Sequence, residues 1–235
     1  MNTALNGSPA GRVAIVTGGS RGVGRATICL LAARGYAVVV NYLHDQRAAE
    51  STVEAILANN GDAVAIRADV ADDLDVKRLF AETIAAFGGI DVVVHAAGSR
   101  ITASPVTEVD LDEFDALVRI NTRATFVVNR EAARHLRNGG AIINLSSSAG
   151  GSSLRTHGLY AATRAPTDVL TRALALELRE RNITVNAVSL EADMPCAPNQ
   201  VADVIAYLLS EYGHGLTGQV LQVGNPGLQP YFPRH

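Results

Sequence analysis

Short apolar runs alternate with longer stretches of helical periodicity along most of the chain. A short apolar run bounded by turn residues is typical of a buried strand, whereas apolar residues that recur every three or four positions indicate a helix packed on one face. On this basis we predict strands at 12–18, 36–42, 63–70, 90–98, 141–150, 183–190 and 218–224. The same reasoning predicts helices at 24–35, 46–61, 74–88, 111–137, 159–181 and 200–210.

The strict alternation of strands and helices, joined by short links, predicts a parallel sheet with helices on both faces. We therefore expect an α/β fold with a doubly wound parallel sheet of about seven strands, Rossmann-like, formed by residues 1–235 as a single domain. In such sheets ligands bind outside the carboxyl ends of the strands. We therefore expect the ligand-binding residues at those ends.

Composition narrows the class of protein. The net charge is −3, which gives no sign of a nucleic-acid surface. No apolar run approaches the length that spans a bilayer, and the first residues have no secretory apolar segment, so we expect a cytoplasmic protein without a membrane partner. The two cysteines, Cys29 and Cys196, form neither a disulfide framework nor a metal-ligand spacing, and no metal is expected. Cys29 lies in an apolar helical run and is predicted to be a core residue.

A glycine-rich segment, TGGSRGVGRA (17–26), links the first predicted strand to the first predicted helix. Gly18, Gly22 and Gly24 permit a tight turn and let the backbone approach a phosphate closely. The helix that follows offers free N–H groups and the positive end of its dipole. The segment is therefore predicted to bind the pyrophosphate of a dinucleotide; the alternative is a glycine-rich turn without a ligand.

The end of the second predicted strand bears on which dinucleotide binds. NAD-binding proteins place an acidic residue there to hold the ribose hydroxyls, but this strand ends at Asn41 and Tyr42. Arg21 lies in the glycine turn, and His44 and Arg47 follow the strand. Because a guanidinium suits a 2′-phosphate, NADP(H) is favoured over NAD(H). The alternative is that these cations are solvated surface residues.

The segment YAATR (160–164) places a phenol and a cation on one helix face, because Tyr160 and Arg164 are four positions apart. A free tyrosine has a pKa near 10, and a neighbouring cation lowers it by favouring the phenolate. The pair is therefore a candidate for proton transfer. Taken alone, such a pair is more often a pair on a helix surface.

Together these motifs resemble those of the short-chain dehydrogenase/reductase family, in particular ketoreductases of the 3-oxoacyl-carrier-protein reductase type. TGGSRGVG is similar to the family's TGxxxGxG, and HAAG (95–98) is similar to its NAAG. Asp69-Val70 matches the pair that touches adenine, Asn121 matches a helix asparagine, and Ser147 lies thirteen residues before Tyr160. The cofactor residues that the resemblance implies are Gly18, Ser20, Arg21, Gly22, Val23, Gly24, Asn41, Asp69, Val70, Ala96, Ala97, Gly98, Tyr160 and Arg164.

The resemblance also implies a reaction. Hydride passes between NADP(H) and a small-molecule carbonyl or the matching alcohol, with Asn121, Ser147, Tyr160 and Arg164 as the catalytic set. Tyr160 acts as general acid or base, Ser147 holds the substrate oxygen, and Asn121 anchors a water that relays protons. The stretches 111–137 and 159–181 are expected to pack against a partner's copies in a homodimer or homotetramer, and both are apolar on more than one face.

Three departures from the family pattern leave the activity open. Arg164 stands where the family has lysine, and the two are not interchangeable at a shaped site. Leu190 and Glu191 replace the usual Pro-Gly after the sixth strand, and Glu191 either faces the nicotinamide or points to solvent. Only 190–199 stands in place of the usual helical lid. In addition, Pro166 is expected to kink its helix and re-aim Arg164.

The sequence therefore supports alternatives. The chain is either a reductase that uses Arg164 in place of lysine, or a dinucleotide-binding protein of the same fold with weak or absent turnover. A third alternative is related chemistry on the same scaffold, such as epimerisation or dehydration. The charge pattern does not indicate a particular substrate.

Overall fold

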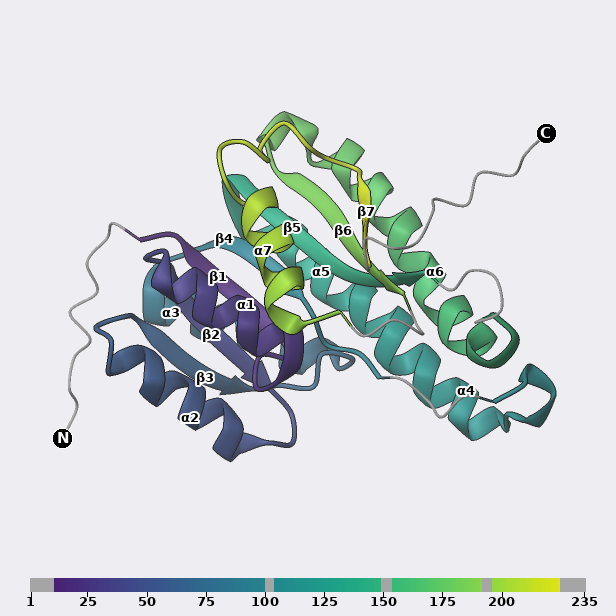
Figure 1. The fold of residues 1–235 in the computed structure, drawn as a ribbon. Helices are drawn as coiled ribbons and strands as arrows, with labels where there is room; N and C mark the ends of the chain where they lie inside the picture. The colour runs from purple at the N-terminus through teal and green to yellow at the C-terminus, as the bar shows by residue number, and fades with distance from the viewer. Residues whose placement is uncertain (1–10, 100–103, 149–153, 192–195, 225–235) are drawn as a thin grey trace.

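The computed structural model describes residues 11–99, 104–148, 154–191 and 196–224. Its seven strands form one sheet in the order β3-β2-β1-β4-β5-β6-β7, and every neighbouring pair is parallel. Figure 1 shows this sheet with helices packed around it. The strands are β1 (Val13–Thr17), β2 (Ala37–Tyr42), β3 (Ala63–Arg67), β4 (Ile90–His95), β5 (Leu136–Ser148), β6 (Thr184–Glu191) and β7 (Val220–Val223). The predicted doubly wound parallel sheet is confirmed.

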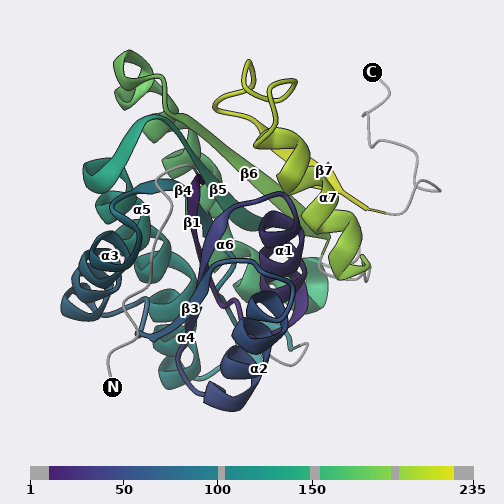
Figure 2. The ribbon, with the colours of Figure 1, turned by 90° about the vertical axis from the view of Figure 1, so that its left-hand side faces the viewer.

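Helices cover both faces of the sheet (Figure 2). Neighbouring strand residues point to opposite faces, so Ala14 and Val16 enter one apolar cluster and Ile15 enters the other. One cluster packs under α1 (Gly22–Ala33), α2 (Gln46–Leu57) and α7 (Pro198–Leu208). The other packs under α3 (Asp73–Phe87), α5 (Ala124–His135) and α6 (Leu154–Glu177). Because both faces are buried, β1 is buried along its whole length and shows no alternation of buried and exposed residues.

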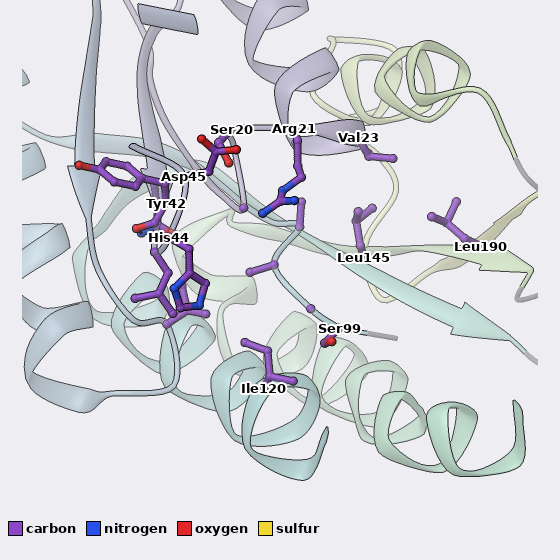
Figure 3. Close-up of a pocket in the computed structure, with 18 of the residues that line it drawn as sticks. Ser20, Arg21, Val23, Tyr42, His44, Asp45, Ser99, Ile120, Leu145 and Leu190 are labelled. Atoms are coloured by element: carbon purple, nitrogen blue, oxygen red, sulfur yellow. The ribbon is translucent and has the colours of Figure 1, made fainter. Parts of the chain in front are cut away.

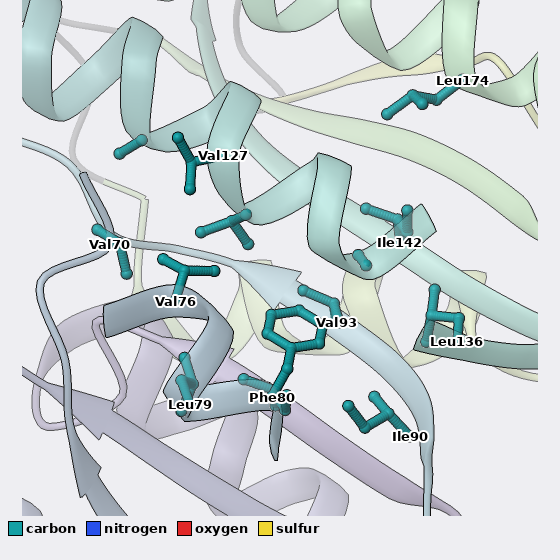
Figure 4. Packing of buried hydrophobic residues seen from close by; sticks show 14 of the residues in the cluster. Val70, Val76, Leu79, Phe80, Ile90, Val93, Val127, Leu136, Ile142 and Leu174 are labelled. Atoms are coloured by element: carbon teal, nitrogen blue, oxygen red, sulfur yellow. The ribbon is translucent and has the colours of Figure 1, made fainter. Parts of the chain in front are cut away.

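The cluster under α3 and α5 centres on Phe80, which is fully buried against β4 and β5 (Figure 4). Leu79, Val93 and Ile142 pack around it. An aspartate cap stabilises the start of α3, because Asp72 accepts hydrogen bonds from the backbone N–H groups of Leu74 and Asp75. Gly88, in the left-handed conformation, ends the helix. The packing of this layer fixes β4, whose carboxyl end borders the site described below.

The direction of chain progression reverses between β1 and β4, since β2 and β3 lie on one side of β1 whereas β4 to β7 lie on the other. At such a switch point the loops that leave the two strands turn to opposite faces and leave a crevice. The glycine turn after β1 and the HAAG segment after β4 border this crevice.

The predicted helical stretch 111–137 is confirmed from Leu111 to His135, with a π-helical turn inside it. It consists of α4 (Leu111–Leu117), a π-helical turn (Val118–Arg123) and α5, and the chain is already extended at Leu136, where β5 begins. The π turn carries the buried Asn121, whose side chain bonds to residues outside the helix. Leu136 pairs with Ile90 in the sheet, and burial of that leucine outweighs helix propensity.

Two further expectations were wrong. Cys29 is exposed on α1, because the buried face of that helix consists of Gly24, Thr27, Ile28 and Leu31 and Cys29 points away from it. Within the described part of α6, the backbone leaves helical torsion angles at His157 and not at Pro166. The proline therefore does not re-aim Arg164.

The two leucines of α3 separate core packing from helix propensity. Leu79 is fully buried and Leu74 is 73 % exposed. We expect Leu79→Ala to lower the free energy of unfolding by about 2–5 kcal/mol, through lost transfer energy and the cavity left behind. Leu74→Ala should change it by about 0.5 kcal/mol or less. Urea unfolding of both variants checks this, and equal losses would contradict the core assignment.

Candidate active site

The glycine turn is shaped by close backbone contacts. A Cβ atom on Gly24 would lie 2.3 Å from the carbonyl oxygen of Gly18, and one on Gly18 would lie 3.0 Å from the Cα of Ala97. Gly18 and Gly22 also have positive φ angles, of 63° and 54°. The turn thus packs against the HAAG segment. Arg21, which precedes α1, forms no side-chain cap, so the first N–H groups of the helix remain available.

A pocket of about 750 Å³ lies over the carboxyl ends of the strands, beside this turn (Figure 3). One end is bordered by Arg21 and His44, and the other by Tyr160 and Arg164. The predicted cofactor residues that line it are Gly18, Ser20, Arg21, Val23, Gly24, Asn41, Val70, Ala96, Ala97, Gly98, Tyr160 and Arg164. Gly22 and Asp69 do not line it.

At the nucleotide end, Arg21 and His44 are exposed and project into the pocket (Figure 3). Asn41 is buried, and its amide donates to the carbonyl oxygens of Ile66 and Ala68, so it joins β2 to β3. Asp45 also lines the pocket, which the sequence reasoning missed. Its carboxylate accepts a hydrogen bond from the N–H of Ala48 and caps α2, and an aspartate just before a helix was the signal.

Asp69 does not line the pocket, but it precedes Val70, which does. One carboxylate oxygen accepts from the Arg119 guanidinium at 2.7 Å, and the other accepts from the N–H of Ala71 at 2.9 Å. Burial opposes ionisation of Asp69, but these bonds outweigh it and lower its pKa. The arrangement fixes the turn that presents Val70 to the pocket.

Asn121 is fully buried and joins two segments of the site. Its side chain accepts from the N–H of Ser99 at 3.1 Å and donates to the Ser99 carbonyl at 3.0 Å. It also donates to the Thr163 hydroxyl, which in turn donates to the Tyr160 carbonyl. Asn121 therefore ties the loop after β4 to the turn of α6 that carries Tyr160.

Tyr160 and Arg164 are both buried in the same face of α6, at 6 % and 5 % exposure. The guanidinium carbon lies 5.9 Å from the centre of the Tyr160 ring, within the range of a cation–π contact. The guanidinium donates to the Leu145 carbonyl at 3.1 Å and to the Ala97 carbonyl at 3.5 Å. It thereby bridges the ends of β4 and β5.

Gly98 accommodates this arginine. A Cβ atom at position 98 would lie only 1.7 Å from an Nη atom of Arg164, and 3.1 Å from the Asn121 side chain. A side chain larger than hydrogen at 98 would displace the guanidinium. The absence of a side chain at Gly98 therefore leaves room for the guanidinium.

Ser147 does not line the pocket: its hydroxyl donates to the Leu190 carbonyl at 2.9 Å. Leu190 is the first of the two residues that stand in place of the family's Pro-Gly. The β5–β6 ladder continues through Ser147 with Leu190 and Ser148 with Glu191, a pairing to which a proline could not donate an N–H group. The side chain of Glu191 lies outside the described residues, as do residues 192–195, where the shortened connection runs.

Ser146 lines the pocket instead, and its hydroxyl donates to Asp168 at 2.6 Å. Sequence reasoning missed both residues. The available signal was spacing, because Asp168 lies one turn after Arg164 on α6 and thus faces the same strand end.

His95, at the end of β4, contacts Thr17, at the end of β1. Its Nδ1 lies 2.9 Å from the Thr17 hydroxyl, which also accepts from the N–H of Ala97. The imidazole is fully buried, and burial, helped by the charge of Arg164, lowers its pKa to about 3. His95 is therefore uncharged at neutral pH.

Residues 12–192 match the family model described as short chain dehydrogenase. The chain belongs to the short-chain dehydrogenase family. It is therefore an oxidoreductase of a family that binds nicotinamide dinucleotides. Among the described residues, no helix is long and apolar enough to cross a membrane.

Curated relatives include versicolorin reductase 1 of Aspergillus parasiticus, 44% identical over 180 residues, which cover 76% of this chain and 68% of the relative. Versicolorin reductase stcU of Emericella nidulans is 36% identical over 249 positions, covering 91% and 94%. Those 249 positions exceed the 235 residues of this chain, so the relative has residues that this chain lacks.

Solved structures agree. A dehydrogenase/reductase from Sinorhizobium meliloti superposes with a TM-score of 0.85 at 35% identity, covering 91% of this chain and 94% of that one. A short chain dehydrogenase from Burkholderia cenocepacia, solved in complex with NADP, has a TM-score of 0.80 at 32% identity, covering 91% and 96%.

The uncharged state of His95 predicts acid sensitivity. The unfolded chain binds a proton on this histidine below about pH 6.5, whereas the folded chain binds it only near pH 3. As the pH falls from about 6.5 to about 3, the free energy of unfolding should therefore decrease by about 1.4 kcal/mol per pH unit. The variant His95→Asn lacks this contribution. The difference in the free energy of unfolding between the native chain and the variant, measured by urea unfolding, should therefore shrink or reverse as the pH falls. Parallel pH profiles would contradict the assignment.

Proposed function

We propose that the chain reduces a carbonyl, or oxidises the matching alcohol, with NADP(H) as hydride carrier and Tyr160 as general acid or base. The observation that carries this proposal is the continuity of the pocket. It runs from the glycine turn and Arg21 to Tyr160 and Arg164, so a dinucleotide lying along it would bring its reactive ring to the tyrosine.

The preference for NADP(H) rests on charge at the nucleotide end. Arg21 and His44 project into the pocket, and neither forms an ion pair among the described residues. Asp45 would disfavour a 2′-phosphate, but its carboxylate is engaged as the cap of α2. The relatives with NADP or NADPH bound in their structures support the same choice.

The proposed chemistry divides between the residues of α6 and those of the strand ends. Tyr160 gives its proton to the substrate oxygen as hydride arrives at the carbon, and the fixed charge of Arg164 stabilises the phenolate that remains. Ser147 must turn its hydroxyl from the Leu190 carbonyl to reach a substrate oxygen. We assign Asn121 a positioning role, because its amide is already bonded to Ser99 and Thr163.

A second candidate is nucleotide binding with little turnover. Two observations favour it: the Arg164 guanidinium is engaged with two strand-end carbonyls, and the Ser147 hydroxyl is engaged with a third. The Ser147 hydroxyl would have to leave the Leu190 carbonyl to serve a substrate.

We also propose a homodimer or homotetramer. Phe114 on α4, Phe126 on α5, and Val169 and Leu176 on α6 are apolar and between 41 % and 75 % exposed. Exposed apolar side chains gathered on the helices expected at the interface support association between copies of the chain.

The cofactor preference is tested at Arg21. Loss of a charge-assisted phosphate contact of about 1.5–3 kcal/mol should weaken NADPH binding to Arg21→Gln by about ten- to a hundred-fold, with little change for NADH. Arg47→Gln is the matched control, because Arg47 is exposed and does not line the pocket. Fluorescence titration with both nucleotides gives the ratio, and an unchanged NADPH-to-NADH preference would contradict the role of Arg21.

The reaction is tested at Tyr160 and Arg164. NADPH consumption with a panel of ketones and diketones should fall by about 10²- to 10⁴-fold in Tyr160→Phe, with NADPH binding retained. Tyr207→Phe is the control, because that tyrosine is 49 % exposed on α7. If the native chain binds NADPH without turnover and Arg164→Lys gains turnover, the binding function is correct and the reductase proposal fails.

A further inference from the structure

Arg164 places a permanent positive charge where water has little access. The residue is 5 % exposed, yet it borders the pocket. Two bonds to neutral carbonyl oxygens use only part of its donor capacity, and its Nε–H has no partner among the described residues. A charge buried in this way is strongly disfavoured unless an opposite charge comes close to it.

The described part of the chain places no carboxylate in direct contact with this charge. No carboxylate there forms an ion pair with Arg164. Asp168 lies one turn further along α6, but its carboxylate accepts the hydroxyl of Ser146. At the far end of the pocket, Asp45 is engaged as the cap of α2.

The wall around the guanidinium is neutral. Ala97, Gly98, Leu145 and Leu190 border this end of the pocket, and Tyr160 is the ionisable neighbour there. Arg164 lines the pocket, so a ligand that enters it can reach the guanidinium. An incoming ligand can therefore bring the missing charge.

We propose that Arg164 selects a substrate that carries an ionised oxygen, a carboxylate or an enolate, next to the carbonyl that is reduced. This inference rests on the proposed function, since it concerns the substrate end of the same pocket. A guanidinium presents paired N–H groups that match two oxygen atoms, whereas a lysine presents a point charge. Arginine at position 164 thus adds anion recognition to the stabilisation of the phenolate.

The test uses benzoate and its neutral isostere benzamide, which carry no group that the enzyme could reduce. Binding of each to the full chain, with and without saturating NADPH, is measured by calorimetry. We expect benzoate to bind at least about ten-fold more tightly than benzamide, as an added charge-assisted contact predicts. In Arg164→Gln the preference should fall to about two-fold or less. Arg21→Gln, which removes the other pocket arginine, should keep it.

Several results would overturn the inference. Equal binding of benzoate and benzamide to the native chain would do so without any variant. A preference that survives in Arg164→Gln, or disappears in Arg21→Gln, would assign it to another cation. A preference seen only in Glu191→Gln would identify that carboxylate as the counterion of Arg164. Failure of the native chain to bind NADPH would overturn the proposed function instead, while the comparison on the free chain would still test Arg164.

Discussion

The site depends on the close contact between two backbone segments at the switch point of the sheet. Gly18 packs so tightly against Ala97 that a Cβ atom would lie 3.0 Å from its Cα. The buried pair His95 and Thr17 holds the same two segments from below. Because β1 and β4 are neighbours in the sheet, this contact lies at the crevice over which the pocket extends from Arg21 to Tyr160 and Arg164.

Two sets of hydrogen bonds hold the end of the pocket that Tyr160 and Arg164 border. Asn121, held in a π-helical turn, joins the loop after β4 to α6, and Arg164 joins α6 back to the ends of β4 and β5. π-helical turns often occur at functional sites because they re-aim one residue without breaking the helix. The position of Tyr160 therefore depends on the hydrogen bonds that join α6 to the loop after β4 and to the end of β5, and not on its helix alone.

Much of this arrangement was predictable from the sequence. The alternation of apolar runs predicted the sheet, and the glycine spacing predicted the turn that borders the pocket. The sequence could not predict which partner each polar group takes. Ser147 bonds to the backbone carbonyl of Leu190 on the neighbouring strand, and Ser146 on β5 bonds to Asp168 on α6. The prediction for Cys29 was wrong because this residue lies in an apolar run but beside the buried face of α1, which includes Ile28 and Leu31.

The space above Gly98 has a consequence for how such a site can change. Since the guanidinium of Arg164 occupies the volume that a β-carbon at 98 would fill, a larger residue at 98 requires this side chain to move or to be replaced. A shorter cation at 164 would leave a void beside the backbone, and an alanine at 98 would then become tolerable. Transplanting this arginine, in its present conformation, into a homologous scaffold thus requires a glycine at the position of Gly98.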